Sequence, residues 1–78
     1  MKRSQSYYLK RVSACVEKLR SGENVNIETI SIDTREGMKK VFNEYLEGLW
    51  LRIGDTAFNK IDYRNTTDYL FEQLEINT

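Results

Sequence analysis

Apolar side chains recur at helical spacing in two long stretches of the chain. The first stretch begins at Tyr8 and repeats every three or four residues, so its apolar members form one stripe on a helix. Before it, Ser4 or Ser6 can accept hydrogen bonds from the free amides of a first helical turn. After it, Gly22 can adopt the left-handed conformation that ends helices. The pattern predicts a helix over residues 5–21.

The second stretch is longer, and its apolar face is wider. From Met38 to Gly54 the apolar rhythm is unbroken, and its arc of about 180° exceeds the roughly 100° of a simple surface helix. Asp33, followed three positions later by Glu36, fits a capping box. The pattern predicts a helix over residues 34–53 that contacts neighbours on two sides. We expect Phe42, Tyr45, Leu49 and Trp50 to form the centre of the core.

Between these helices lies a segment with the character of a β-strand. Residues 25–32 are rich in β-branched side chains and alternate apolar with polar positions. The alternation slips by one position at Glu28 and Thr29, which indicates a bulge or a bend. Because a strand needs a partner for its backbone groups, we expect pairing with residues 57–63 or with the same strand of a second subunit. Residues 57–63 fit either a strand or a helical turn, and we favour the strand.

A third helix is predicted near the end of the chain. Asn65 can cap it, and Leu70, Phe71 and Leu74 turn inward, which gives a helix over residues 66–75. The sequence as a whole predicts one compact α+β domain over residues 1–78. It is predominantly helical, with three helices and one or two short strands.

The side chains that most catalytic and metal sites need are scarce. The chain has no histidine, and its one cysteine, Cys15, lies in the apolar stripe of the first helix, where a thiol without a base is inert. The carboxylates match no calcium loop, and the isolated glycines form no phosphate-binding loop. We therefore expect no enzyme, no catalytic residue, no metal and no cofactor.

Hydropathy and cysteine content bear on where the protein works. No stretch reaches the roughly 18 apolar residues of a membrane span. The first 20 residues lack the apolar core and the cleavage site of a secretory signal. A single cysteine forms no internal disulfide. These features predict a cytoplasmic protein with no membrane contact.

Charge is distributed unevenly along a chain whose net charge is zero. The first 20 residues contain six basic residues and one acidic residue, so the remainder carries a matching acidic excess. An acidic surface over residues 23–78 suits a protein that docks on a basic surface of another protein. Our leading hypothesis is a small protein-binding regulator or inhibitor. Its size and its Asn, Ile, Lys and Tyr content suit an accessory factor of a phage or mobile element.

The wide apolar face of the helix over residues 34–53 supplies the predicted contact surface. A domain this small has a thin margin of stability, and such domains often gain stability from a partner. We expect a partner protein or a second subunit, giving a homodimer, to cover part of this face. The predicted interface residues are Leu46, Trp50, Ile53, Glu44 and Glu47.

The basic N-terminal helix supports an alternative hypothesis. Lysine and arginine neutralise phosphates, and tyrosine stacks on bases. A small nucleic-acid-binding regulator would use Arg3, Tyr7, Lys10, Arg11 and Lys18. Both hypotheses stay open at the level of sequence, because nothing in the sequence identifies the partner.

Overall fold

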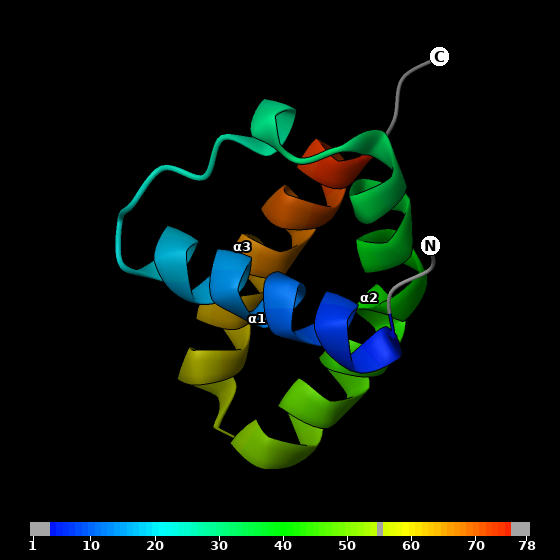
Figure 1. Cartoon of the computed structure of the whole chain (residues 1–78). Helices are drawn as coiled ribbons and strands as arrows, with labels where there is room; N and C mark the ends of the chain where they lie inside the picture. Colours follow the sequence, from blue (N-terminus) through cyan, green and yellow to red (C-terminus); the bar gives the residue numbers. More distant parts are fainter. Residues whose placement is uncertain (1–3, 55, 76–78) are drawn as a thin grey trace.

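Three helices form most of the computed structural model, which describes residues 4–54 and 56–75 apart from the side chains of residues 57 and 58. Helix α1 spans Gln5–Arg20, α2 spans Ile32–Ile53 and α3 spans Ala57–Leu74, while a 3₁₀ turn, η1, occupies Ile27–Thr29. Each helix contacts the other two. Helix α3 runs back antiparallel to α2, and α1 crosses both (Figure 1).

The ends of α1 follow the predicted signals closely. Of the two candidate serines, Ser4 is the cap, and its hydroxyl accepts from the Tyr7 amide at 3.2 Å. At the other end Gly22 has a φ of +83°, and the Glu23 amide donates to the Lys18 carbonyl at 2.9 Å. These bonds satisfy backbone groups that the helix itself leaves unpaired.

Helix α2 ends at the predicted residue but begins earlier than predicted. Gly54, with a φ of +67°, follows its last turn. The predicted cap at Asp33 is wrong, because Ser31 caps the helix by accepting from the Thr34 amide at 3.2 Å. Asp33 instead lies in the first turn, where its negative charge interacts favourably with the helix dipole.

The predicted α+β class is wrong, because the described residues contain helices and turns but no strand. In residues 25–32, the Asn26 side chain accepts from the Glu28 amide at 3.1 Å and starts η1. This turn places Ile27 and Ile30 on the core side. The slip in the apolar alternation is therefore the 3₁₀ turn, which satisfies backbone groups locally instead of through a strand partner.

Residues 57–63, predicted as a strand, form the first turns of α3, which starts nine residues before the predicted residue 66. Tyr63, Thr67, Leu70 and Leu74 lie on one helical face directed at the core. Because Thr67 is polar, the spacing of apolar residues in the sequence does not reveal this helical face. The buried hydroxyl of Thr67 donates to the Arg64 carbonyl at 3.1 Å, so the threonine is accommodated in the helix interior.

Apolar side chains from all three helices and from the η1 segment form the core. The predicted two-sided contact of α2 is confirmed, since α2 contacts both α1 and α3. Trp50, expected at the centre, lies at the edge of the core and is only partly buried. The buried core residues are Val12, Cys15, Val16, Ile27, Ile30, Met38, Val41, Phe42, Tyr45, Leu49, Leu70 and Leu74.

A surface network joins α1 to α3. Arg20 donates to Asp62, with a shortest distance of 2.7 Å, and its guanidinium lies 3.9 Å from the centre of the Tyr63 ring. The Tyr63 hydroxyl in turn donates to Glu17 at 3.3 Å. Exposed ion pairs of this kind contribute roughly 0–1 kcal/mol each, so the network orients the two helices more than it stabilises them.

The contact between α1 and α2 depends on the small size of Gly37. A Cβ atom at this position would overlap the ring of Tyr8, whereas a Cβ at Gly48 on the same helix would enter open space. We expect Gly37→Ala to lower the free energy of unfolding by about 1–3 kcal/mol, because the Tyr8 ring must move. Gly48→Ala should raise it by about 0.5–1 kcal/mol through helix propensity alone. Urea unfolding of the two variants tests this, and stabilisation of both by similar amounts would contradict the close contact.

Candidate protein-interaction surfaces

A groove with a volume of about 460 Å³ runs between α2 and α3 beside Trp50. Leu46 and Trp50, both predicted interface residues, are partly buried here, and Ile61 of α3 is 62% exposed at the opposite wall. Apolar side chains surrounded by charged ones are typical of a contact surface for another protein. We call this surface the Trp50 groove, and its lining residues are Leu46, Trp50, Lys60, Ile61, Arg64, Thr67 and Asp68.

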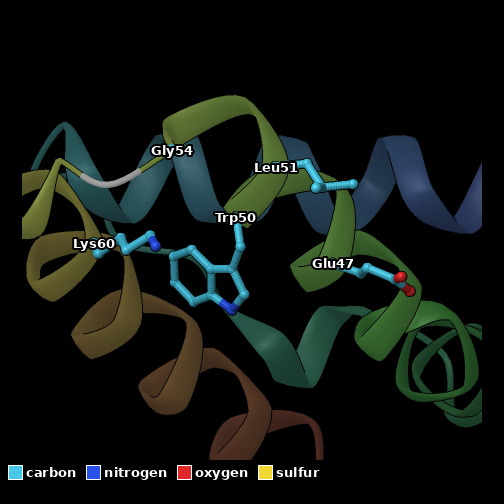
Figure 2. Close-up of a pocket in the computed structure, with 5 residues that line it drawn as sticks. All are labelled: Glu47, Trp50, Leu51, Gly54 and Lys60. Atoms are coloured by element: carbon cyan, nitrogen blue, oxygen red, sulfur yellow. The ribbon is translucent and has the colours of Figure 1, made fainter.

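Opposite charges flank Trp50. Glu47 of α2 and Lys60 of α3 line a smaller hollow, of about 400 Å³, together with the indole. Figure 2 shows the Trp50 side chain directed from α2 toward α3, with Lys60 on one side of it and Glu47 on the other. The charged residues that line the Trp50 groove itself, Lys60, Arg64 and Asp68, all belong to α3, while Glu47 and Leu51 of α2 line the smaller hollow beside it.

A second surface lies on the exposed face of α2 between the Trp50 groove and α1. We call it the outer edge, and it consists of Asp33, Glu36, Lys40, Glu44 and Leu51, which recur at helical spacing and include no buried residue. Leu51 is 79% exposed, more than any other large hydrophobic side chain of the described chain. Within residues 4–54 and 56–75, none of the three acidic residues of the outer edge forms an ion pair. The outer edge therefore combines an exposed apolar side chain with an excess of unneutralised acidic charge.

The structure separates the five predicted interface residues. Leu46 and Trp50 share the Trp50 groove with Glu47 beside them, but Ile53 packs against the core and is not among the groove residues. Glu44 lies toward α1, where it lines a broad hollow of about 760 Å³ together with Lys10. The prediction of one continuous interface is therefore replaced by two adjoining surfaces of α2, the Trp50 groove and the outer edge, with Glu47 and Leu51 between them.

Two exposed apolar residues of these surfaces were missed in the sequence. Leu51 lies one position after Trp50, on the polar side of the α2 rhythm, and a single leucine there is not by itself a signal. Ile61 was assigned to a strand. Only the helical conformation of residues 57–63 brings its side chain beside Trp50.

The predicted nucleic-acid contacts share one face of α1, except Arg3, which lies outside the described residues. Lys10 and Lys18 are exposed, while Arg11 is partly buried and donates to the Tyr7 hydroxyl at 3.5 Å. The guanidinium of Arg11 also lies 5.8 Å from the centre of the Tyr7 ring. No ion pair to Lys10, Arg11 or Lys18 is formed by the acidic residues of the described chain. This basic face therefore keeps its charge available to an anionic partner.

The described residues offer little for chemistry. Burial raises the pKa of the Cys15 thiol, and the opposing effects of Arg11 and Lys18 are smaller, so the reactive thiolate is disfavoured. Across residues 4–54 and 56–75 no three Cys, Asp or Glu side chains gather in a group able to hold a metal ion. None of the helices in this part of the chain is long and apolar enough to cross a membrane.

Comparison of the chain with protein-family models, with curated proteins and with solved structures finds no match. Its function must therefore be inferred from its own surfaces. The Trp50 groove, the outer edge and the basic face of α1 are three surfaces of the described residues that combine charge or exposed apolar side chains.

Proposed function

We propose that this protein is a small non-enzymatic regulator or inhibitor that binds another protein through the outer edge of α2. The observation that carries the proposal is Leu51, 79% exposed beside acidic residues that no described basic residue neutralises. Burial of a leucine side chain in a contact contributes about 1.5–3 kcal/mol. The acidic residues would attract a basic surface and exclude an acidic one. The partner is accordingly a protein with a basic surface.

The proposal places the protein in the cytoplasm, as an accessory factor of a phage or mobile element that binds a host protein. The unpaired thiol of Cys15 suits a reducing compartment. The mode of action is binding alone, and the basic surface on the partner can be one that the partner uses to bind its own anionic ligand. Binding there would inhibit the partner by competition.

A capture experiment with matched baits tests the proposal. The intact protein, a Glu36→Gln/Glu44→Gln variant and a Glu23→Gln/Glu72→Gln control are immobilised and exposed to extract of the source cells. All four residues are exposed, and the two variants lose the same charge. We expect one protein to be retained about tenfold less by the outer-edge variant than by the control. Equal retention by all three baits, or no specific retention, would refute this function.

A second candidate function is favoured by the basic face of α1, whose lysines and arginine form no ion pair with the acidic residues of the described chain. A nucleic-acid-binding regulator would engage phosphates through Lys10 and Lys18. A Lys10→Gln/Lys18→Gln variant should then reduce the slope of log affinity against log salt concentration by about 2, and a Lys39→Gln/Arg52→Gln control should not. Mobility-shift assays with duplex and single-stranded DNA decide this, and the absence of any salt-sensitive shift eliminates the candidate.

A further inference from the structure

We propose that a hollow between α1 and the segment that follows it binds a phosphate group, free or carried by a phosphomonoester. The hollow has a volume of about 230 Å³. Sites for drug-sized ligands occupy roughly 300–1,000 Å³, so this one suits a small group. We call it the Arg11 hollow, and its lining includes Arg11, Cys15 and Lys18 of α1 with Asn24, Asn26 and Thr29 of the following segment.

The charged side chains that line the Arg11 hollow are both basic. No described acidic residue lines it, and neither Arg11 nor Lys18 forms an ion pair with an acidic residue of the described chain. Burial raises the pKa of the Cys15 thiol, and Arg11 and Lys18 both oppose this effect. Such opposition requires that both positive charges lie near the sulfur. The two charges therefore act on the same small space, where they would attract an anion.

Arg11 has a hydrogen-bond donor that the protein does not use. Its Nε is buried without a partner, and no other buried side-chain nitrogen or oxygen of the described residues lacks one. The bond from its Nη1 to the Tyr7 hydroxyl is long, at 3.5 Å. Buried donors in native proteins are normally satisfied, and a planar guanidinium matches the oxygens of a phosphate. A phosphate in the hollow would supply the acceptors that this guanidinium lacks.

The segment after α1 adds neutral donors. The Asn26 side-chain oxygen accepts from the Glu28 amide at 3.1 Å, which leaves its amide nitrogen to donate. Asn24 is exposed and brings a second side-chain amide to the hollow. The Thr29 hydroxyl donates to the Asn26 carbonyl at 2.7 Å, so it holds the turn and does not donate to a ligand. Two positive charges and two amides without a described carboxylate suit a doubly charged phosphate.

This inference goes beyond the proposed function, because the Arg11 hollow shares no residue with the outer edge of α2. It also differs from the nucleic-acid candidate, since Lys10 lines the broad hollow toward α2 and not this one. The proposals can therefore fail independently. A Glu36→Gln/Glu44→Gln variant should still bind phosphate, and a protein that binds no phosphate can still capture a protein partner.

Nuclear magnetic resonance of the labelled protein, titrated with inorganic phosphate, glycerol phosphate and acetate at constant ionic strength, tests the proposal. We expect saturable shifts at the side-chain amides of Asn24 and Asn26 with either phosphate, and acetate at least about tenfold weaker. Asn26→Asp keeps an acceptor for the Glu28 amide, and so keeps the turn, but it removes the donor and adds negative charge. It should weaken binding at least about tenfold. Asn65→Asp makes the same change at an exposed site of α3 and should leave the affinity unchanged.

A pair of lysine variants separates a site from general attraction. Lys10 and Lys18 are both exposed on α1, so Lys10→Gln and Lys18→Gln lose the same charge. Lys18→Gln should weaken phosphate binding about tenfold, whereas Lys10→Gln should change it by no more than about twofold. The spectra themselves show that each variant is folded.

The outcomes separate clearly. Tighter binding of glycerol phosphate would identify a phosphomonoester as the ligand, and tighter binding of inorganic phosphate would identify the free anion; both support the site. The absence of saturable shifts up to about 50 mM phosphate would overturn the proposal. So would acetate that binds as tightly as phosphate, an Asn26→Asp variant that binds like its control, or equal losses in the two lysine variants.

Discussion

Phe42→Ala is expected to lower the free energy of unfolding by about 3–5 kcal/mol. The ring is 2% exposed, and its centre lies 5.3 Å from that of Phe71 and 6.4 Å from that of Tyr45, both in edge contacts. Its removal leaves a cavity between α2 and α3. Because small domains have a total stability of roughly 5–10 kcal/mol, much of the stability would be lost. Urea unfolding followed by circular dichroism measures the change.

A milder substitution and an exposed aromatic control keep this prediction testable. Phe42→Leu keeps most of the volume and should cost less than Phe42→Ala, so it remains measurable if the alanine variant does not fold. Tyr69→Ala removes a ring of α3 that is 52% exposed, and it should cost no more than about 1 kcal/mol. A Phe42→Ala variant within 1 kcal/mol of the original protein would contradict the described core.

Leu70→Ala should lower the free energy of unfolding by about 2–5 kcal/mol, because Leu70 is fully buried where α3 meets the core. Leu51→Ala is a matched control: it makes the same chemical change on a helix at a side chain that is 79% exposed, and we expect a change within about 0.5 kcal/mol. Thermal and urea unfolding of the two variants compare the sites. Similar losses for both would mean that α3 is not docked through this face.

The helices that the sequence predicted well are those whose local signals agree with one another. In α1 the apolar stripe, the cap at Ser4 and the stop at Gly22 all indicate the same element. In α2 the apolar rhythm and the stop at Gly54 were correct, while the start was misplaced because Ser31 and Asp33 are both good caps. Where two residues have similar capping propensity, the conformation of the backbone before the helix decides which of them is the cap.

The two predicted strands failed because β propensity is weak without a partner. Residues 25–32 have the side chains of a strand, but a single strand leaves its backbone groups unpaired, and Asn26 offers a local turn instead. Residues 57–63 form the first turns of a helix whose buried face includes the polar Thr67. A search for apolar residues at helical spacing misses that position and therefore misses the helix. Both errors arise because tertiary packing, which a short stretch of sequence does not show, determines the conformation of these residues.

The candidate surfaces, like the fold, were predicted only in part. The wide apolar arc of α2 indicated contacts of Leu46 and Trp50 beyond a single helix partner, and both side chains are partly buried at the edge of the core, although Trp50 was expected at its centre. Which charged residues of α2 lie beside α3 depends on where α3 packs. The predicted α3 was too short to show this. Lys60 and Ile61 could not be placed beside Trp50 while residues 57–63 were read as a strand.

The central claim is that residues 57–63 are helical and bring α3 beside Trp50, because the Trp50 groove and the hollow that Leu51 shares with Lys60 depend on it. Nuclear magnetic resonance of the labelled protein tests this most directly. We predict helical Cα shifts throughout residues 57–63, with nuclear Overhauser contacts from the Trp50 indole to the side chains of Lys60 and Ile61. Strand-like shifts in this segment, or an indole without contacts to either side chain, would contradict the account.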